Sequence, residues 1–244
     1  MATILATRLL SAERRFFLTM AVIVLGIVFI GFAPSFYLRG VVPPYAPFKP
    51  TTPLVIVHGM LFTGWTLLFM TQVGLVSAGR VDLHRKLGAI GIFVLAAMIV
   101  VGMLSALNGV ARHSGPPMVP PLAWLAIPFF DVPMFGTLIG VALYNRRNPQ
   151  THKRLMLIAM FGMCAPAIGR TAGAFGLPGP VFVVPLLVGL VTMLALWDRS
   201  SRGSAHRATK WGGSFLIGSW LFRLVIMWTP PWLAFAAWAS GLVA

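Results

Sequence analysis

Long apolar runs without charged residues dominate this chain and restrict what it can fold into. The first extends from Phe16 to Leu38, and no charged side chain interrupts it. About 20 apolar residues are enough for an α-helix to cross the hydrocarbon core of a membrane. The sequence therefore predicts an all-α, polytopic transmembrane bundle of about seven spans, in one integral membrane domain over residues 1–244. The six further runs lie at about 54–76, 87–107, 122–144, 153–172, 180–197 and from 211 to the Pro230-Pro231 pair.

The composition excludes a soluble domain. Hydrophobic residues make up 58% of the chain and charged residues only 9%, with a mean hydropathy of +0.89. Soluble domains carry about 25% charged residues. The net charge of +15 does not indicate nucleic-acid binding, because the bases lie in short turns between apolar runs rather than on one face or tail. We expect the lipid bilayer, and no nucleic acid, as the partner.

The distribution of the bases predicts the orientation in the membrane. Of the 19 Lys and Arg residues, 14 lie in the N-terminal segment or in the turns after the second, fourth and sixth runs, and 4 lie in the other loops. Cytoplasmic loops carry an excess of Lys and Arg. We therefore expect a bacterial inner-membrane protein with a cytoplasmic N-terminus and a periplasmic C-terminus. Residues 1–15 are predicted to form a cytoplasmic amphipathic segment, and residues 230–244 an interfacial one.

A histidine followed by two bases occurs twice at the start of an apolar run, at His84 and at His152. Each histidine lies 31 positions after a proline that opens the preceding run, Pro53 or Pro121. This offset predicts an internal duplication in which each copy forms two antiparallel helices joined by a basic turn. Both histidines would then lie at the same cytoplasmic depth. The predicted pseudo-repeats are 53–107 and 121–172.

Two imidazoles at one depth, facing each other across a helical bundle, can serve as the axial ligands of a haem iron. His84 and His152 are thus candidate ligands of a b-type haem, in a protein of haem-linked or quinone-linked electron transfer. The alternative is that histidines beside Lys and Arg anchor the helix ends at the membrane interface. The neighbouring bases are candidates for holding the haem propionates: Arg85, Lys86, Lys153 and Arg154.

A second set of ionisable residues is predicted to lie toward the opposite, periplasmic side. Ionisable residues inside a membrane are costly and often functional, so this set predicts the substrate or proton site of a proton-coupled transporter. The prolines around its one carboxylate, Pro128 and Pro133, are expected to break the helix and free carbonyl groups. The alternative is a buried ion pair that fixes the register of two helices. The set comprises His58, Asp131, Arg170 and Arg223.

The remaining patterns leave the enzyme class open. Walker, GxSxG and HExxH motifs are absent, and four acidic residues provide no carboxylate pair for hydrolysis. The single cysteine, Cys164, lies within an apolar run and cannot form an intramolecular disulfide. A third reading is a non-catalytic subunit of a membrane complex, or a homo-oligomer. Its seam would be the Gly136/Gly140 face or the tryptophan-rich C-terminal end.

His84 and His152 on the third and fifth helices, with His58 on the second, resemble part of the pattern of the cytochrome b-561 family. The resemblance covers about residues 53–172. It implies a four-helix core in which histidines of the second and fourth helices hold one haem and those of the third and fifth hold another. The repeat offset places Ala126 at the fourth-helix position, so the resemblance implies at most one haem here. The motifs His-Arg-Lys-Leu-Gly and His-Lys-Arg-Leu-Met also resemble those of uncharacterised bacterial membrane-protein families.

Overall fold

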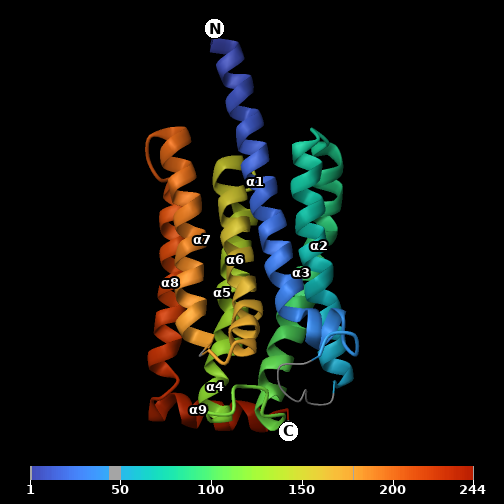
Figure 1. The fold of residues 1–244 in the computed structure, drawn as a ribbon, viewed down its shortest axis with the longest axis vertical. Helices are drawn as coiled ribbons and strands as arrows, with labels where there is room; N and C mark the ends of the chain where they lie inside the picture. Colours follow the sequence, from blue (N-terminus) through green and yellow to red (C-terminus); the bar gives the residue numbers. More distant parts are fainter. Residues whose placement is uncertain (1, 44–50, 178, 244) are drawn as a thin grey trace.

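The computed structural model describes residues 2–43, 51–177 and 179–243, and these form an all-α bundle of long helices (Figure 1). Within these ranges the only β-type pairing is an isolated bridge between Arg39 and Val42. A short π-helical turn, η1, follows the first helix. The elements are α1 (Ala2–Phe32), η1 (Ala33–Tyr37), α2 (Pro53–Ser77), α3 (Val81–Ala111), α4 (Pro121–Trp124), α5 (Ala126–Tyr144), α6 (Pro149–Ala174), α7 (Gly179–Arg202), α8 (Arg207–Ile226) and α9 (Pro230–Gly241).

The bundle has the helices that a polytopic membrane protein needs. In the described part of the chain six helical segments are long and apolar enough to cross a membrane, and α8 with α9 would make a seventh, bent span. The predicted fold class is therefore confirmed. Single helices can cross a bilayer because all their backbone hydrogen bonds are made within the helix.

The C-terminal helix α9 turns by 93° from α8 and lies across one end of the bundle (Figure 1). Thr229, which precedes two prolines, takes an extended conformation because proline disfavours a helical residue before it. The indole of Trp232 donates a 3.0 Å hydrogen bond to the carbonyl of Leu122, and this bond connects α9 to α4. That residues 230–244 lie at a membrane interface stays a prediction, and Ala244 is outside the described residues.

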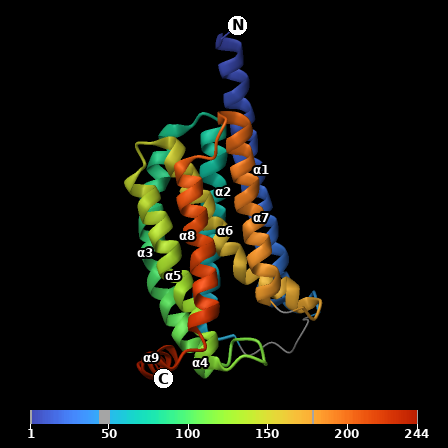
Figure 2. The same cartoon turned by 90° about the vertical axis from the view of Figure 1, so that its left-hand side faces the viewer.

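The N-terminal segment continues directly into the first span. α1 is one helix from Ala2 to Phe32, and its start projects beyond the other helices (Figures 1 and 2). The predicted amphipathic segment 1–15 is therefore the first part of α1 rather than a separate helix. Its place at the cytoplasmic surface stays a prediction, and Met1 is outside the described residues.

The two halves of the predicted duplication form two helical hairpins, α2 with α3 and α5 with α6. His84 is the fourth residue of α3, and His152 is the fourth residue of α6. The second hairpin has an additional break at Leu125, between α4 and α5. The expected break at Asp131 is wrong: α5 runs continuously through Pro133 to Tyr144.

Helix α6 is the centre of the bundle, because it packs against α1, α5, α7 and α8. Its contact with α1 is especially close at Gly31. A Cβ atom on Gly31 would come within 2.4 Å of the carbonyl oxygen of Ala167. Only glycine allows this approach, and it brings the end of α1 against the last turns of α6.

Candidate functional site

The predicted polar residues are divided between the two ends of the bundle. We call the end where α1 begins the N-terminal end, and the end covered by α4 and α9 the C-terminal end (Figure 1). The turns after α2, α5 and α7 lie at the N-terminal end. His84 and His152 therefore lie there, and His58, Asp131, Arg170 and Arg223 lie toward the C-terminal end.

The rings of His84 and His152 are neighbours and lie edge-on to one another. Their centroids are 6.3 Å apart and their planes meet at 83°. Both side chains are partly buried. The two imidazoles that the repeat predicts at one depth therefore lie next to each other, with their planes nearly perpendicular.

Helix α5 fixes the orientation of His152. The Nδ1 atom of His152 lies 2.8 Å from the carbonyl oxygen of Ala142. A carbonyl can only accept a hydrogen bond, so this contact places the proton of a neutral imidazole on Nδ1. The lone pair of Nε2 is then free to bind a metal. A ring nitrogen hydrogen bonded in this way is the usual support of a metal-binding histidine.

His84 has a comparable but incomplete environment. Its Nδ1 atom is buried without a hydrogen-bond partner. The backbone of Gln72, on the preceding helix α2, lies close enough to influence it electrostatically. The side-chain oxygen of Gln72 is also buried without a partner. Sequence reasoning assigned no role to Gln72, although a glutamine in an apolar run was a usable signal.

The four bases next to the histidines have different surroundings. Arg85 and Lys86 are exposed. Lys153 contacts the carboxylate of Glu13 on α1 at 2.5 Å, and Arg154 is buried in an ion pair with a carboxylate of α7. Lys153 and Arg154 are thus held by carboxylates of the chain itself, and Arg85 and Lys86 are the more accessible cations.

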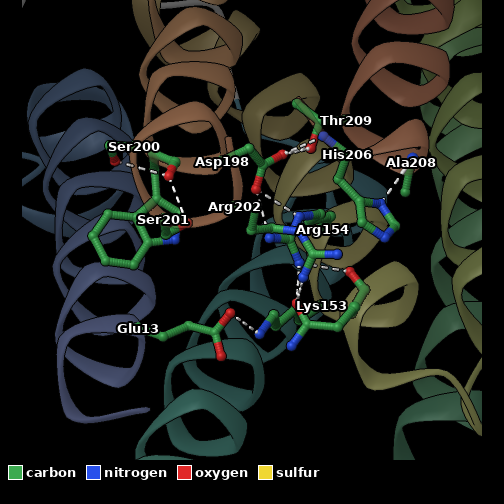
Figure 3. A network of polar contacts seen from close by, with 12 residues as sticks. Glu13, Lys153, Arg154, Asp198, Ser200, Ser201, Arg202, His206, Ala208 and Thr209 are labelled. Carbon is green, nitrogen blue, oxygen red and sulfur yellow. Dashed lines mark hydrogen bonds and ion pairs between the residues drawn. The ribbon is translucent and has the colours of Figure 1, made fainter. Parts of the chain in front are cut away.

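Arg154 belongs to a buried polar network that joins α6, α7 and α8 (Figure 3). Arg154 and Asp198 have side chains that are 0% exposed. Nε and Nη2 of Arg154 donate to Oδ1 of Asp198 at 2.8 and 2.5 Å, and Nη1 donates to the carbonyl of Gln150 at 2.9 Å. The second carboxylate oxygen accepts from the backbone N–H of His206 and the hydroxyl of Thr209. Sequence reasoning missed this network.

His206 caps the start of α8 in the same network. Its Nδ1 atom accepts a 3.0 Å hydrogen bond from the backbone N–H of Ala208, so the cap requires the neutral imidazole. Burial, followed by the positive charges of Arg154 and Arg202, holds the pKa of His206 below its usual value. The cap and the lowered pKa therefore both favour the neutral imidazole of His206.

At the C-terminal end, Asp131 and Arg223 form an ion pair between α5 and α8. Nη1 of Arg223 donates to Asp131 at 2.5 Å and to the carbonyl of Ile127 at 3.1 Å. Nε and Nη2 donate to the carbonyl and the hydroxyl of Ser219. The guanidinium also lies over the ring of Trp220, 4.7 Å from its centroid. Arg223 is therefore satisfied on every side, which is typical of a structural ion pair.

The other two residues of the predicted set lie elsewhere, on α2 and α6. Arg170 donates to the carbonyl of Pro166 at 3.4 Å and lies over the ring of Phe32, 4.5 Å from its centroid. His58 stacks on Phe62, with ring centroids 4.1 Å apart. Of the four residues predicted as one site, only Asp131 and Arg223 are therefore in direct contact in the structure.

An open apolar groove of about 360 Å³ lies between α3 and α5. Gly136 of the predicted Gly136/Gly140 seam lines it. None of the predicted polar site residues lines it. The residues lining the groove are Ile99, Met103, Val132, Pro133, Gly136 and Thr137.

Among the described residues, no group of three or more His, Cys, Asp or Glu side chains is placed to hold a metal ion. The chain matches no protein family, no curated protein and no solved structure at a significant level.

Proposed function

We propose that this integral membrane protein binds one b-type haem through His84 and His152 and transfers electrons within the membrane. The observation that carries the proposal is that two imidazoles, from helices α3 and α6, lie next to each other at one end of the bundle. Membrane quinones are the class of electron partner that this function implies.

The spacing of the two rings fits one metal ion between them. Metal–nitrogen bonds to histidine are about 2.1 Å long, so His84 and His152 would together hold one ion if their rings lay about 6 Å apart. The observed separation is 6.3 Å.

The orientation of the rings supports the same reading. The carbonyl of Ala142 holds Nδ1 of His152, which leaves Nε2 to coordinate. Nδ1 of His84 is buried near the backbone of Gln72, on the equivalent preceding helix. Histidines that only anchored helix ends would be exposed to headgroups and water, whereas these two are partly buried beside each other.

The charges next to the pair suit the carboxylate side of the cofactor. Arg85 and Lys86 follow His84 and remain exposed, so they are the bases that would hold the propionates. A bound haem would supply reversible one-electron chemistry. The chain would set its potential through the two ligands, the nearby cations and the partial exclusion of water.

The C-terminal ion pair gives less support to the transporter reading. Asp131 is held by Arg223, and every donor nitrogen of that guanidinium contacts an acceptor of the protein. A carboxylate held in this way fits a fixed connection between α5 and α8 better than a proton carrier.

The test is the visible absorption spectrum of protein purified from cells that make haem. We expect a Soret band, sharper α and β bands after reduction with dithionite, and about one haem per chain by pyridine haemochromogen assay. His84→Leu and His152→Leu should each abolish the six-coordinate spectrum. His58→Leu, which removes a histidine at the other end of the bundle, is the matched control and should leave it unchanged.

Two results would overturn the proposal. One is wild-type protein that stays colourless after reconstitution with excess haem. The other is a double variant, with both His84 and His152 replaced by leucine, that keeps the wild-type spectrum. A haem bound at other residues would produce the second result.

A further inference from the structure

The acidic side chains of this chain are all engaged by other bases, and this leaves Arg170 without a carboxylate. The chain has four Asp and Glu residues. Each of them contacts a different base: Glu13 contacts Lys153, Asp82 contacts Arg80, Asp131 contacts Arg223, and Asp198 contacts Arg154. The counter-ion of Arg170 is therefore not an Asp or Glu side chain of the same chain.

Arg170 lies about one turn before the end of α6, at the C-terminal end of the bundle. Its contacts with the protein are a 3.4 Å hydrogen bond to the carbonyl of Pro166 and the face of Phe32. The side chain is exposed at the surface of the bundle. A cation in an apolar setting is costly unless it is compensated, and the exposed side of this guanidinium is open to an external anion.

His58 on α2 provides a second polar group close to this guanidinium. Its Nδ1 atom is buried and has no hydrogen-bond partner, although its ring stacks on Phe62. Arg170 is close enough to act on His58 electrostatically. A buried imidazole nitrogen without a partner is a group that a ligand can satisfy.

The π-helical turn η1 connects the two residues. Phe32, immediately before η1, lies under Arg170. Phe36, within η1, packs against Gly59 next to His58, since a Cβ on Gly59 would come within 2.5 Å of its ring. The hydroxyl groups of Tyr37 and Thr63 are 3.0 Å apart and hold η1 on α2. Such π-helical turns are rare and occur frequently at functional sites.

We propose that Arg170 and His58 together bind a phosphate group at the C-terminal end of the bundle. The guanidinium presents two N–H groups to a phosphate, which matches phosphate geometry better than a single point charge does. The imidazole N–H adds a third donor. Phospholipid headgroups and free phosphate share this chemistry, and the aromatic rings of Phe32 and Phe62 favour a lipid.

Native mass spectrometry of delipidated protein in detergent, titrated with phosphatidylglycerol, tests the site. We expect wild-type protein to retain one lipid, and Arg170→Gln to weaken its binding by roughly tenfold or more, as loss of a charge-assisted contact does. His58→Leu should weaken it less, and His58→Gln, which keeps a donor, should restore part of the loss. Arg39→Gln is the matched control, because Arg39 is an exposed base at the same end.

A competition arm identifies the source of the phosphate. Displacement of the lipid by millimolar inorganic phosphate would identify free phosphate as a ligand, and retention of the lipid would identify the phospholipid. Equal lipid binding by wild type and Arg170→Gln would overturn the proposal, as would an equal loss in Arg39→Gln and Arg170→Gln. His84→Leu should bind lipid normally, so this outcome does not depend on whether haem is bound.

Discussion

Removal of the Asp198 carboxylate should destabilise the fold more than any other single change of a polar side chain in the helices. Asp198 accepts four hydrogen bonds, two from Arg154, one from the backbone of His206 and one from Thr209. Both members of the ion pair have side chains that are 0% exposed. Asp198→Ala therefore leaves a buried guanidinium without its counter-ion and two further donors without an acceptor.

The expected loss of unfolding free energy is about 3–5 kcal/mol, the range measured when one partner of a buried ion pair is removed. Replacing both partners with apolar residues, Arg154→Met with Asp198→Leu, should cost clearly less than the sum of the two single changes. The reason is that no buried charge then remains without compensation. The double variant thus separates the cost of an orphaned charge from the loss of the bond itself.

Equilibrium unfolding in mixed micelles of dodecyl maltoside and sodium dodecyl sulfate, followed by tryptophan fluorescence, measures these free energies. Asp82→Ala is the control, because Asp82 forms an exposed pair with Arg80, and it should leave the transition unchanged. The reasoning would be refuted if Asp198→Ala unfolded with the wild-type midpoint. Strictly additive losses in the double variant would refute it as well.

Three further predictions concern other contacts. Stability should fall as the pH drops below about 6.5, because folding lowers the pKa of His206 and the helix cap needs its neutral imidazole. His206→Asn should keep the cap and flatten this part of the profile of stability against pH. Gly31→Leu should separate α1 from α6 at Ala167, and lower the melting temperature measured by circular dichroism more than Gly26→Leu, a position with open space. Arg223→Met should lower the midpoint of detergent unfolding by leaving the partly buried carboxylate of Asp131 without its counter-ion, and Asp131→Leu in the same chain should recover part of the loss.

The sequence predicted the spans well because the membrane imposes a simple rule, about 20 apolar residues per crossing. It predicted their ends less well. α3 starts at Val81, and α6 starts at Pro149 with its Asn148 cap, several residues before the apolar runs begin. Hydropathy reports where the chain meets hydrocarbon, and a helix can continue through charged residues beyond that limit.

The repeat offset predicted that His84 and His152 lie at one depth, but it did not predict the direction of their rings. His84 and His152 occupy the same position of their helices, and their rings meet. The residues of the second predicted site, toward the C-terminal end, are not related to one another by a repeat. Depth alone placed Asp131 and Arg170 in one group, whereas α5 and α6 present them to different neighbours.

The partner of Arg154 could not be predicted from local patterns. Asp198 is 44 positions away, on a helix that becomes its neighbour only in the folded bundle. In the sequence, Arg154 could not be distinguished from the other bases expected at the membrane interface. Only the packing of α6 against α7 shows that this one is buried.

The central position of α6 has a consequence for how the chain enters the membrane. Among the six apolar segments identified, α6 has the lowest hydropathy and the largest buried share, 67% of its most apolar stretch. Other helices, rather than lipid tails, surround it, so its affinity for the bilayer comes largely from its neighbours. A translocon would therefore insert α6 into lipid inefficiently on its own. Membrane insertion of α6 should depend on contacts with the helices that are inserted before it.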